Sequence, residues 1–471
     1  MGTLAAMSLG NRLLLLVSVV ALVVGVLGST ASAQVARATP TEVTIGAPAA
    51  FAGEQTTLRI GLADPQGAPV AGAAVTVERR AGDTWEVVAT VTTDETGRAA
   101  QPVTLERRRE RNLFRATYAG DADHDPGAAQ ERVALKRRAS VVRLGGPGKV
   151  KDGRAVEITV RWVTQGGEPV AGRVKVFRSI AGGRWRLDRV VKTGADGRAA
   201  FRTTPRADSR WFARAPRLDW VVGDKSGVHR IDNRPPGVPV KLPAAAPRPR
   251  IKLPPQARGT GRGANVRITR IPSRVWRDMT GVSWRQGCPV GRAGLRLVRV
   301  NYWDYQGYVR RGEVVAAASA AGPMGAALAE MFEKKLPIRA MYRVDRFGWG
   351  HRSRGGDDYA SMSAGNTSAF NCRDVTGRPG VRSPHSYGRS LDINTWENPY
   401  RSAQGVVPNT WWQSRSHPRV AWRSRSHPVV EVMARHGFRW TYGTGDTQHF
   451  DYVGSYSRAA VAPRACDRYC D

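Results

Sequence analysis

Histidine and aspartate residues stand near the C-terminal end of the sequence at spacings that suit a metal site. His385 and Asp392 lie seven positions apart in SPHSYGRSLDIN (383–394), and His449 begins the run HFDYV (449–453). Two imidazoles and one carboxylate form the protein ligand set of a catalytic zinc site, with the fourth position left for water. One carboxylate offsets half of the zinc charge, so the ion stays acidic enough to activate that water. We therefore predict that these three residues bind Zn²⁺.

Two further residues have types and positions that suit a hydrolytic reaction. Asp446 lies three positions before His449, from where a carboxylate reaches a metal-bound water without ligating the metal, as a general base must. The same group can later protonate a leaving amine. Arg373 follows Cys372 and would offer positive charge to a substrate carbonyl or carboxylate. Taken singly, Asp446 is also an ordinary turn residue and Arg373 an ordinary solvated charge.

Two short strands would bring the candidate ligands together. The run 390–394 alternates apolar and polar residues, so Asp392 is expected on the side opposite the apolar residues. Gly388 permits a tight turn that folds His385 back beside Asp392. The run 449–453 alternates in the same way. Antiparallel pairing of the two strands would gather the three ligands around one point.

The surrounding sequence predicts a compact α+β domain over residues 266–471. Residues 324–334 carry good helix formers with apolar residues at three- and four-residue spacing. Residues 428–437 begin with proline and end with glycine, as helices do. Six of the eight histidines lie after residue 350, which singles out this part of the chain.

The middle of the chain repeats itself, because residues 65–100 align with residues 164–200. Short alternating runs separated by Asp-Gly and Asp-x-x-Gly turns predict antiparallel strands in two β-sandwiches, over 41–137 and 138–232. Each unit resembles a bacterial immunoglobulin-like module. Neither contains a cluster of His, Cys or paired carboxylates, so we expect a spacer or a wall-adhesion role. The anchors of the alignment are Pro69/Pro169, Trp85/Trp185 and Gly97-Arg98/Gly197-Arg198.

The first 33 residues are typical of an export signal. Arg12 precedes an apolar run over 13–27, and Ala31-Ser32-Ala33 forms a small-residue cleavage site. The alternative is an uncleaved membrane anchor, but the run of about 15 residues is shorter than the roughly 20 that a spanning helix needs. No later stretch is predicted to span a membrane. We therefore expect a secreted or cell-wall-associated protein.

Four cysteines follow, all in the C-terminal part of the chain. An even number in an exported protein favours disulfides, and four cysteines allow three pairings. Cys288 with Cys372 and Cys466 with Cys470 is the most economical pairing, and the choice stays open. A Cys₄ zinc site is the weaker alternative, because Cys288 and Cys372 belong to no C-x-x-C pair.

Basic residues outnumber acidic ones, with 73 Lys+Arg against 39 Asp+Glu and a formal charge of +34. Such a charge favours attraction to polyanions in general. The export signal favours acidic wall polymers, and we find no signature of a nucleic-acid-binding domain. A coding bias toward arginine would give the same charge, so charge alone names no partner. Residues 233–265, rich in proline and basic residues, are predicted to form an extended linker.

Three separated motifs resemble those of the M15 peptidases, the family of D-alanyl-D-alanine carboxypeptidases and endolysin peptidases. SPHSYGRSLD (383–392) is similar to the signature S-x-H-x-x-G-x-A-x-D, with Ser390 in place of the usual alanine. Upstream, 358–362 and 366–373 look like the wall-peptidase branch. Downstream, DTQHF (446–450) is similar to the closing D-x-x-H-F element. The resemblance covers roughly residues 280–455 and excludes the repeats.

The resemblance implies a role for each matching residue. His385, Asp392 and His449 would ligate zinc, and Asp446 would act as general base. Arg373 would stabilise the polarised carbonyl, and Ser383 would contact the substrate. The fold implied is a small α+β domain with an antiparallel sheet, and the substrates are peptidoglycan stem peptides, cut at D-Ala–D-Ala or L-Ala–D-Glu bonds. The competing interpretation is a secreted adhesin that keeps this fold and binds the wall without cutting it.

Overall fold

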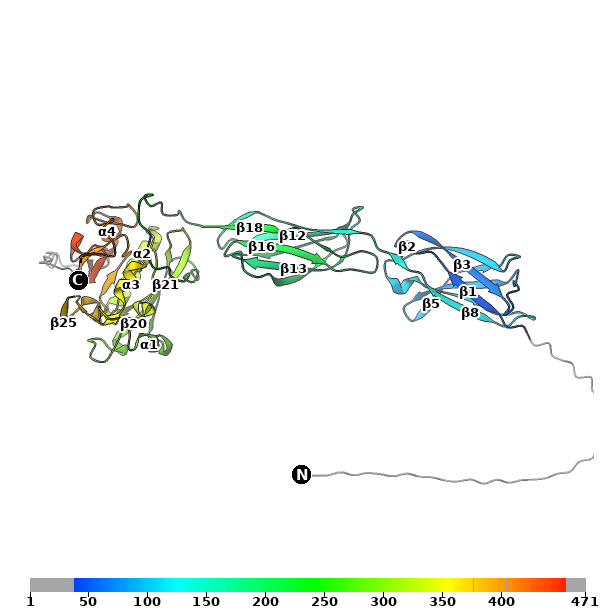
Figure 1. The fold of residues 1–471 in the computed structure, drawn as a ribbon, viewed down its shortest axis with the longest axis horizontal. Coiled ribbons are helices and arrows are strands. Elements are labelled where there is room, and N and C mark those ends of the chain that lie inside the picture. Colours follow the sequence, from blue (N-terminus) through cyan, green and yellow to red (C-terminus); the bar gives the residue numbers. More distant parts are fainter. Residues whose placement is uncertain (1–37, 376, 403–404, 455–471) are drawn as a thin grey trace, which may run out of the picture. The chain divides into compact units, whose positions relative to one another are not determined.

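The protein is described by a computed structural model that covers residues 38–375, 377–402 and 405–454. The predicted export signal and Cys466 and Cys470 lie outside these residues. The described chain forms two compact units, one of residues 38–138 with 218–222 and one of residues 139–217 with 223–454. Strands predominate and helices are few (Figure 1). The sequence-based expectation of β-rich repeats followed by a region with helices is met at this level.

The first β-sandwich, residues 38–138, packs a three-stranded sheet (β1-β3-β6) against a four-stranded sheet (β5-β4-β7-β8). Both sheets contribute to one core, with Leu58 and Ile60 from β3 and Val75 and Phe114 from the other sheet fully or almost fully buried. The elements are β1 (Glu42–Gly46), β2 (Ala50–Phe51), β3 (Gln55–Ala63), β4 (Ala74–Ala81), β5 (Thr84–Thr92), β6 (Arg98–Thr104), η1 (Arg109–Asn112), β7 (Leu113–Tyr118), β8 (Gly127–Arg132) and β9 (Leu135–Lys136).

The second β-sandwich, residues 139–217 and 223–234, has the same plan. A three-stranded sheet (β10-β12-β15) accompanies a larger sheet in the order β11-β18-β16-β13-β14, to which β17 adds beside β16. Its core includes Trp162 and Trp211, both fully buried. The elements are β10 (Ser140–Gly145), β11 (Lys149–Lys151), β12 (Val156–Thr164), β13 (Gly172–Ile180), β14 (Arg186–Thr193), β15 (Arg198–Thr203), β16 (Ser209–Ala215), β17 (Asp224–Lys225) and β18 (His229–Arg234).

The sequence repeat corresponds to a repeat of local structure. The hydroxyl of Thr93 donates to the carbonyl of Val70 at 2.7 Å, and that of Thr193 donates to the carbonyl of Val170 at 2.7 Å. Gly97 has φ +68° and Gly197 has φ +71°. A side chain at either glycine would strike a backbone carbonyl, at 2.5 Å and 2.4 Å respectively, so both positions require glycine. The same turn therefore closes the same strand pair in both sandwiches.

The C-terminal region, residues 266–454, contains the described helices longer than one 3₁₀ turn, and none of them combines the length and apolar composition that crossing a bilayer requires. Helix α2 begins six residues before the predicted segment 324–334 and ends one residue before its end, and α4 begins at Pro428 as predicted. The main elements are β19 (Arg267–Arg270), α1 (Ser273–Met279), β20 (Leu295–Trp303), β21 (Val309–Ala317), α2 (Ala318–Glu333), α3 (Asp358–Ser363), β26 (Ser390–Asp392), α4 (Pro428–Arg435), β29 (Phe438–Arg439) and β30 (His449–Tyr452).

Smaller elements of the same region form its loops and edges. Three two-stranded ladders, β22-β23, β24-β25 and β27-β28, lie between α2 and α4 in the sequence. They are short because glycine, proline and arginine interrupt every apolar run in this stretch. These elements are η2 (Arg292–Gly294), η3 (Val344–Phe347), β22 (Trp349–Gly350), β23 (Gly355–Gly356), β24 (Asp374–Val375), β25 (Arg378–Arg382), η4 (Pro384–Tyr387), β27 (Tyr400–Ser402), β28 (Gly405–Val407) and η5 (Gly443–Gly445).

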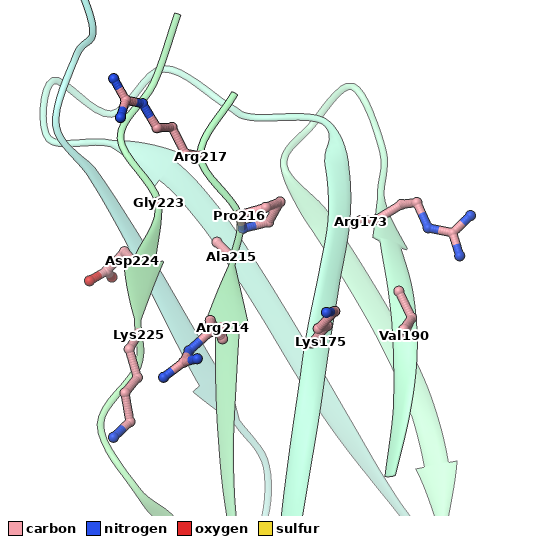
Figure 2. Close-up of a pocket in the computed structure, with 10 residues that line it drawn as sticks. All are labelled: Arg173, Lys175, Val190, Arg214, Ala215, Pro216, Arg217, Gly223, Asp224 and Lys225. Carbon is pink, nitrogen blue, oxygen red and sulfur yellow. The ribbon is translucent and has the colours of Figure 1, made fainter. Parts of the chain in front are cut away.

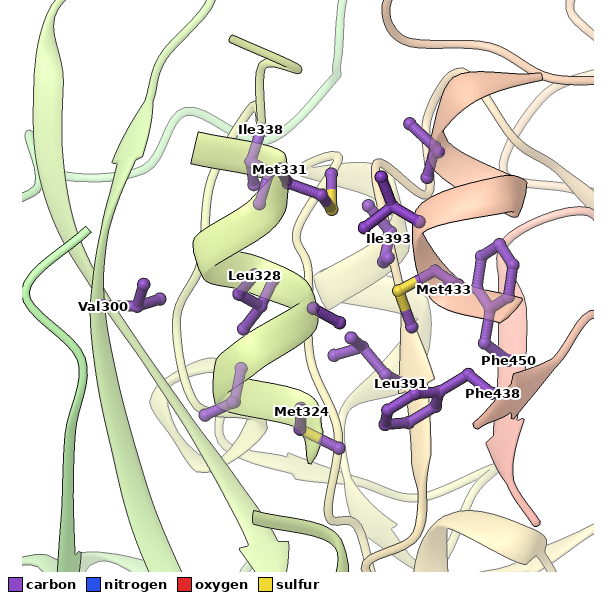
Figure 3. Packing of buried hydrophobic residues seen from close by; sticks show 14 of the residues in the cluster. Val300, Met324, Leu328, Met331, Ile338, Leu391, Ile393, Met433, Phe438 and Phe450 are labelled. Atoms are coloured by element: carbon purple, nitrogen blue, oxygen red, sulfur yellow. The ribbon is translucent and has the colours of Figure 1, made fainter. Parts of the chain in front are cut away.

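One hydrophobic core lies behind the strands that carry the candidate ligands. Leu391 and Ile393, which flank Asp392, are fully buried, as is Phe450 next to His449. Figure 3 shows Leu391 and Ile393 between Leu328 of α2 and Met433 of α4. Because Leu391 and Ile393 on either side of Asp392 and Phe450 after His449 are anchored in this core, the side chains of Asp392 and His449 are held on the other side of the backbone.

The proline-rich stretch between the second sandwich and β19 contains no helix or strand. It nevertheless packs on the C-terminal region. The indole of Trp396 donates to the carbonyl of Pro247 at 2.7 Å, and Leu242 and Ala246 pack against the cluster of Trp396 and Trp412. The lack of helix and strand agrees with the composition, whereas the role as an extended linker stays a prediction.

Candidate metal centre

His385, Asp392 and His449 meet at one point. Nε2 of His385 lies 3.1 Å from Nδ1 of His449. Nδ1 of His449 lies 3.1 Å from Oδ1 of Asp392, and Nε2 of His385 lies 3.3 Å from Oδ2 of Asp392. All three residues are buried. The predicted ligands are thus brought together by a structure in which His385 and His449 are 64 positions apart in sequence.

The predicted strand pairing explains two of the three positions. Strands β26 and β30 are antiparallel, and Asp392 stands directly opposite His449 in their register. Their side chains therefore project from the same side of the sheet at adjacent positions. His385 arrives from the short helix η4, which ends at Gly388 with φ +65°. This left-handed residue turns the chain between His385 and β26, as the sequence predicted.

The spacing of the donor atoms fits a metal ion of zinc size. Metal–nitrogen bonds of about 2.0–2.1 Å in tetrahedral geometry place neighbouring ligand atoms about 3.3 Å apart. The three measured separations of 3.1, 3.1 and 3.3 Å are close to that edge length. Nitrogen and carboxylate oxygen are also the ligand types that zinc accepts. The cluster can therefore bind a metal ion, with three protein ligands and room in the coordination sphere for a fourth group.

Hydrogen bonds set the orientation of both imidazoles. Nδ1 of His385 is 2.7 Å from the backbone carbonyl of Ala369, which can only accept, so this nitrogen carries the proton and Nε2 is left to face the cluster. Nε2 of His449 is 2.9 Å from Oδ1 of Asp451, which leaves Nδ1 to face the cluster. Partners of this kind fix ring orientation in metal sites and increase the basicity of the ligand.

Asp451 is a residue that the sequence analysis missed. Its carboxylate accepts from the hydroxyl of Ser390 at 2.6 Å and from that of Thr441 at 2.7 Å, in addition to its contact with His449. Ser390 is opposite Asp451 in the β26–β30 register. The available signal was the spacing of His449 and Asp451, since residues i and i+2 of a strand lie on one face. Ser390, which stands where the family signature has alanine, therefore belongs to the chain of contacts that supports a ligand.

The electrostatic field of the cluster favours a cation. Burial alone would lower the pKa of His385, but the adjacent Asp392 carboxylate outweighs it and the pKa is raised. Burial likewise opposes the charged form of His449, yet Asp451 and Asp392 raise its pKa well above the usual range. The pKa of Asp392 is lowered despite burial, because both imidazoles lie beside it. The carboxylates that raise the pKa of both imidazoles would also favour a bound cation at this site.

Asp446, the candidate base, is buried and lies next to the cluster in sequence but outside it in space. Among the described residues, only His385, Asp392 and His449 form the group whose ligand atoms lie within 4.8 Å of one another. The turn after Asp446 is held firmly, because the indoles of Trp422 and Trp440 both donate to the carbonyl of Thr447, at 2.5 and 2.9 Å. Asp446 is thus not one of the clustered residues, and its role as general base stays a prediction.

Arg373 is buried beside the cluster and held from two directions. The Cys288–Cys372 disulfide, the predicted pairing, fixes the preceding residue. Nε of Arg373 lies 2.5 Å from Oδ2 of Asp358. Its positive charge reaches the ligands, since it is one of the groups that act to lower the pKa of His385. The predicted cation is therefore present, but Asp358 shares its charge, which the sequence did not predict.

The side chain of Ser383 is buried and contacts the backbone, so it is not exposed to solvent. It is fully buried, and its hydroxyl accepts from the backbone N–H of His385 at 3.4 Å, at the start of η4. Its own N–H donates to the carbonyl of Arg373 at 3.1 Å. Ser383 thus links the segment carrying Arg373 to the turn carrying His385, and its contact with a substrate stays a prediction.

Comparison with known proteins finds one family whose model matches part of the chain. Residues 376–452 match the M15 peptidase family described as D-alanyl-D-alanine carboxypeptidase. The match includes the three clustered residues and Asp446, and it supports an M15-family peptidase domain at the C-terminal end. Arg373 and both sandwiches lie outside it. No curated protein matches the sequence.

Solved structures with similarity to the chain include three of Escherichia coli alpha-2-macroglobulin. The native conformation is 11% identical with a TM-score of 0.20, and covers 56% of this chain and 18% of that one. The form activated by porcine elastase is 11% identical with a TM-score of 0.19, and covers 55% of this chain and 26% of that one. The trypsin-activated form is 9% identical with a TM-score of 0.20, and covers 56% and 19%. Similarity at this level carries no conclusion about function.

Proposed function

We propose that the protein is a zinc-dependent peptidase that hydrolyses bonds in peptidoglycan stem peptides. The observation that carries the proposal is the convergence of two oriented imidazole nitrogens and one carboxylate, at 3.1–3.3 Å, inside the segment that matches the peptidase family. His385, Asp392 and His449 would hold the ion. A zinc ion bound there would polarise a carbonyl group and make a water molecule more acidic.

The chain's own residues supply the remaining steps. Asp446 accepts the proton of the attacking water and later donates it to the leaving amine. The guanidinium of Arg373 faces the charge that develops on the carbonyl oxygen, a type of interaction often worth about 3 kcal/mol per donor. Burial of Arg373 and Asp446 supports these roles, because charges act more strongly where water is excluded.

We also propose that the two sandwiches are immunoglobulin-like modules of an exported protein and that they position the peptidase at the wall. Their paired sheets and their repeated turn chemistry support the first part. The signal-like first 33 residues and the Cys288–Cys372 disulfide support export, since disulfides persist in oxidising compartments.

Digestion of purified muropeptides by the full chain tests the proposal. Mass spectrometry should show loss of a terminal alanine if the D-Ala–D-Ala bond is cut, or release of the stem from L-alanine if the L-Ala–D-Glu bond is cut. The Asp446→Asn variant should turn over at least about 10²-fold more slowly while it retains zinc. Intact muropeptides after incubation with the zinc-loaded chain would refute the peptidase and favour the adhesin. Near-normal rates in the variant would refute only the role of Asp446.

A further inference from the structure

A row of positive side chains crosses the larger sheet of the second β-sandwich. Lys175 on β13 stands directly opposite Arg214 on β16, and Arg214 stands directly opposite Lys225 on β17. Figure 2 shows the three residues on neighbouring strands, in the order Lys225, Arg214, Lys175. All three are exposed. We call these three residues the cationic row.

Cross-strand neighbours of like charge repel each other, so the row destabilises the sheet that carries it. No carboxylate among the described residues forms a salt bridge with any of the three. The carboxylate nearest in sequence is Asp224, but its Oδ2 accepts from the backbone N–H of Val142 at 2.7 Å. The row therefore has no ion-pair partner among the described residues, although the carboxylate of Asp224 lines the same concave surface.

The row lies in a concave surface of about 700 Å³. Arg173 and Arg217 add two further cations to its lining, and Val190 and Pro216 supply apolar surface. Two aromatic rings next to the row limit its movement. Phe177 stacks on Phe212 with ring centroids 4.8 Å apart, and Nζ of Lys225 lies 4.8 Å above the Phe212 ring. This face of the sheet is thus positively charged and concave, and the Lys225 side chain is partly held by the Phe212 ring.

The first β-sandwich shows that the fold does not require the row. Thr76 directly precedes Val77, after which the register of β4 shifts, as Lys175 directly precedes Val176, after which the register of β13 shifts. The cross-strand partners of Thr76 are Thr90 and Thr117, and Thr117 is opposite Ala128. The positions that are cationic in the second sandwich are therefore neutral in the first. The fold does not require positive charge at these positions.

We propose that the concave face around the cationic row binds a linear wall polymer joined by phosphodiester groups. Successive cations across neighbouring strands, about 4.8 Å apart, suit an extended chain with one negative charge in each unit. Lysine and arginine side chains are both used to bind phosphate groups. The choice of a wall polymer among polyanions rests on the proposed function, whereas the binding surface itself does not.

Binding of lipid-free poly(glycerol phosphate) to the full chain, measured at several NaCl concentrations, tests this proposal. This polymer has no peptide bond, so the result is independent of peptidase activity. The triple variant Lys175→Gln/Arg214→Gln/Lys225→Gln should bind about tenfold or more weakly at low salt. The slope of log K against log [NaCl] should decrease by about 2, at about 0.7 for each lost contact.

The opposite sheet of the same sandwich provides a matched control. Arg143, Arg161 and Arg198 are exposed and also stand opposite one another on three neighbouring strands. Replacing these three by Gln removes the same charge and should change affinity less than about twofold. Equal weakening by the two triple variants would overturn the proposal, because binding would then follow net charge alone.

Two further measurements test the assigned face and the assigned polymer separately. Hydrogen exchange on the unmodified chain should show slower exchange in β13 and β16, and not in β12, when poly(glycerol phosphate) is added. Protection confined to β12 would overturn the assigned face, even if the triple variant failed to fold. Poly-glutamate of equal charge should bind more weakly, and equal binding of poly-glutamate would overturn the assignment to a phosphodiester polymer.

Discussion

The cluster of His385, Asp392 and His449 and the cationic row both place side chains directly opposite each other on neighbouring antiparallel strands. They differ in the charge and the burial of those side chains. In the cluster, Asp392 and His449 stand opposite each other on antiparallel strands and are buried. Their charges are opposite when Asp392 is ionised and His449 is protonated. In the row, Lys175 and Arg214 stand opposite each other, are exposed, and have the same charge. The first arrangement attracts a small cation into a fixed site, and the second attracts an extended anion to a surface. Cross-strand register thus brings side chains together, and their charge and burial determine which ligand the pair of strands would bind.

A single substitution in the buried cluster should abolish metal binding. His385→Ala should reduce bound zinc from about one ion per chain to none, because two ligands rarely hold a catalytic ion. Peptidase activity should be lost with the metal. Elemental analysis of the purified variant measures this, with His436→Ala, which contacts Glu330 away from the cluster, as control. Retention of one zinc ion by His385→Ala would show that the cluster is not the metal site.

The support of His449 predicts a smaller effect at the same site. Asp451→Asn should lower zinc affinity about 10- to 100-fold without abolishing binding, because residues behind a ligand orient it and do not replace it. Competition with a chelator of known affinity measures the change. Ser390→Ala removes only one of the hydroxyls on Asp451 and should have a smaller effect. Unchanged affinity in both variants would contradict the supporting role.

A variant of the first sandwich separates the effect of charge from the effect of shape. Thr76→Lys/Thr117→Arg/Ala128→Lys would build the row without the concave surface of the second sandwich, so affinity for poly(glycerol phosphate) should rise less than about twofold at low salt, as expected for the row of Arg143, Arg161 and Arg198. The same measurement on Thr44→Lys, on the other sheet of that sandwich, is the control. A rise of about tenfold would mean that the charge, and not the concave shape, decides binding.

The smallest effect concerns stability. Lys175→Thr removes one of the two repulsive pairs of the row, because Arg214 and Lys225 remain opposite each other. The variant should raise the free energy of unfolding by about 0.5 kcal/mol. Urea denaturation of the variant and the unmodified chain in low salt measures the difference, and added salt should reduce it. A destabilised variant would contradict the repulsion inferred from the register.

Local sequence patterns predicted the cluster because its strands are short and regular. Alternation around Asp392 and His449 placed them on one face, and Gly388 accounted for the turn that returns His385. The Cys288–Cys372 pairing followed from economy, because Cys466 and Cys470 are close neighbours in sequence. The alternation and the turn depend on residues near one another along the chain. The disulfide joins residues 84 positions apart, and it was predicted only because the other two cysteines are near neighbours.

Features that depend on distant register could not be predicted. The cationic row joins residues 175, 214 and 225, which lie on β13, β16 and β17. Sequence does not give these partner strands. The ion pair of Arg373 with Asp358 and the packing of the proline-rich stretch on Trp396 likewise depend on tertiary contacts between remote segments.

Gly388 connects the ligand turn to a helix of the core. Its carbonyl accepts from the N–H of Ala317 at 2.7 Å, immediately before α2, and a side chain at Gly388 would lie 2.7 Å from the same nitrogen. The turn and α2 therefore cannot separate without breaking this contact. Unfolding of α2 would release the ion, and an ion at 100 times its dissociation constant would stabilise the folded chain by about 2.7 kcal/mol. The supply of metal would thus change the fraction of the chain that is folded at equilibrium.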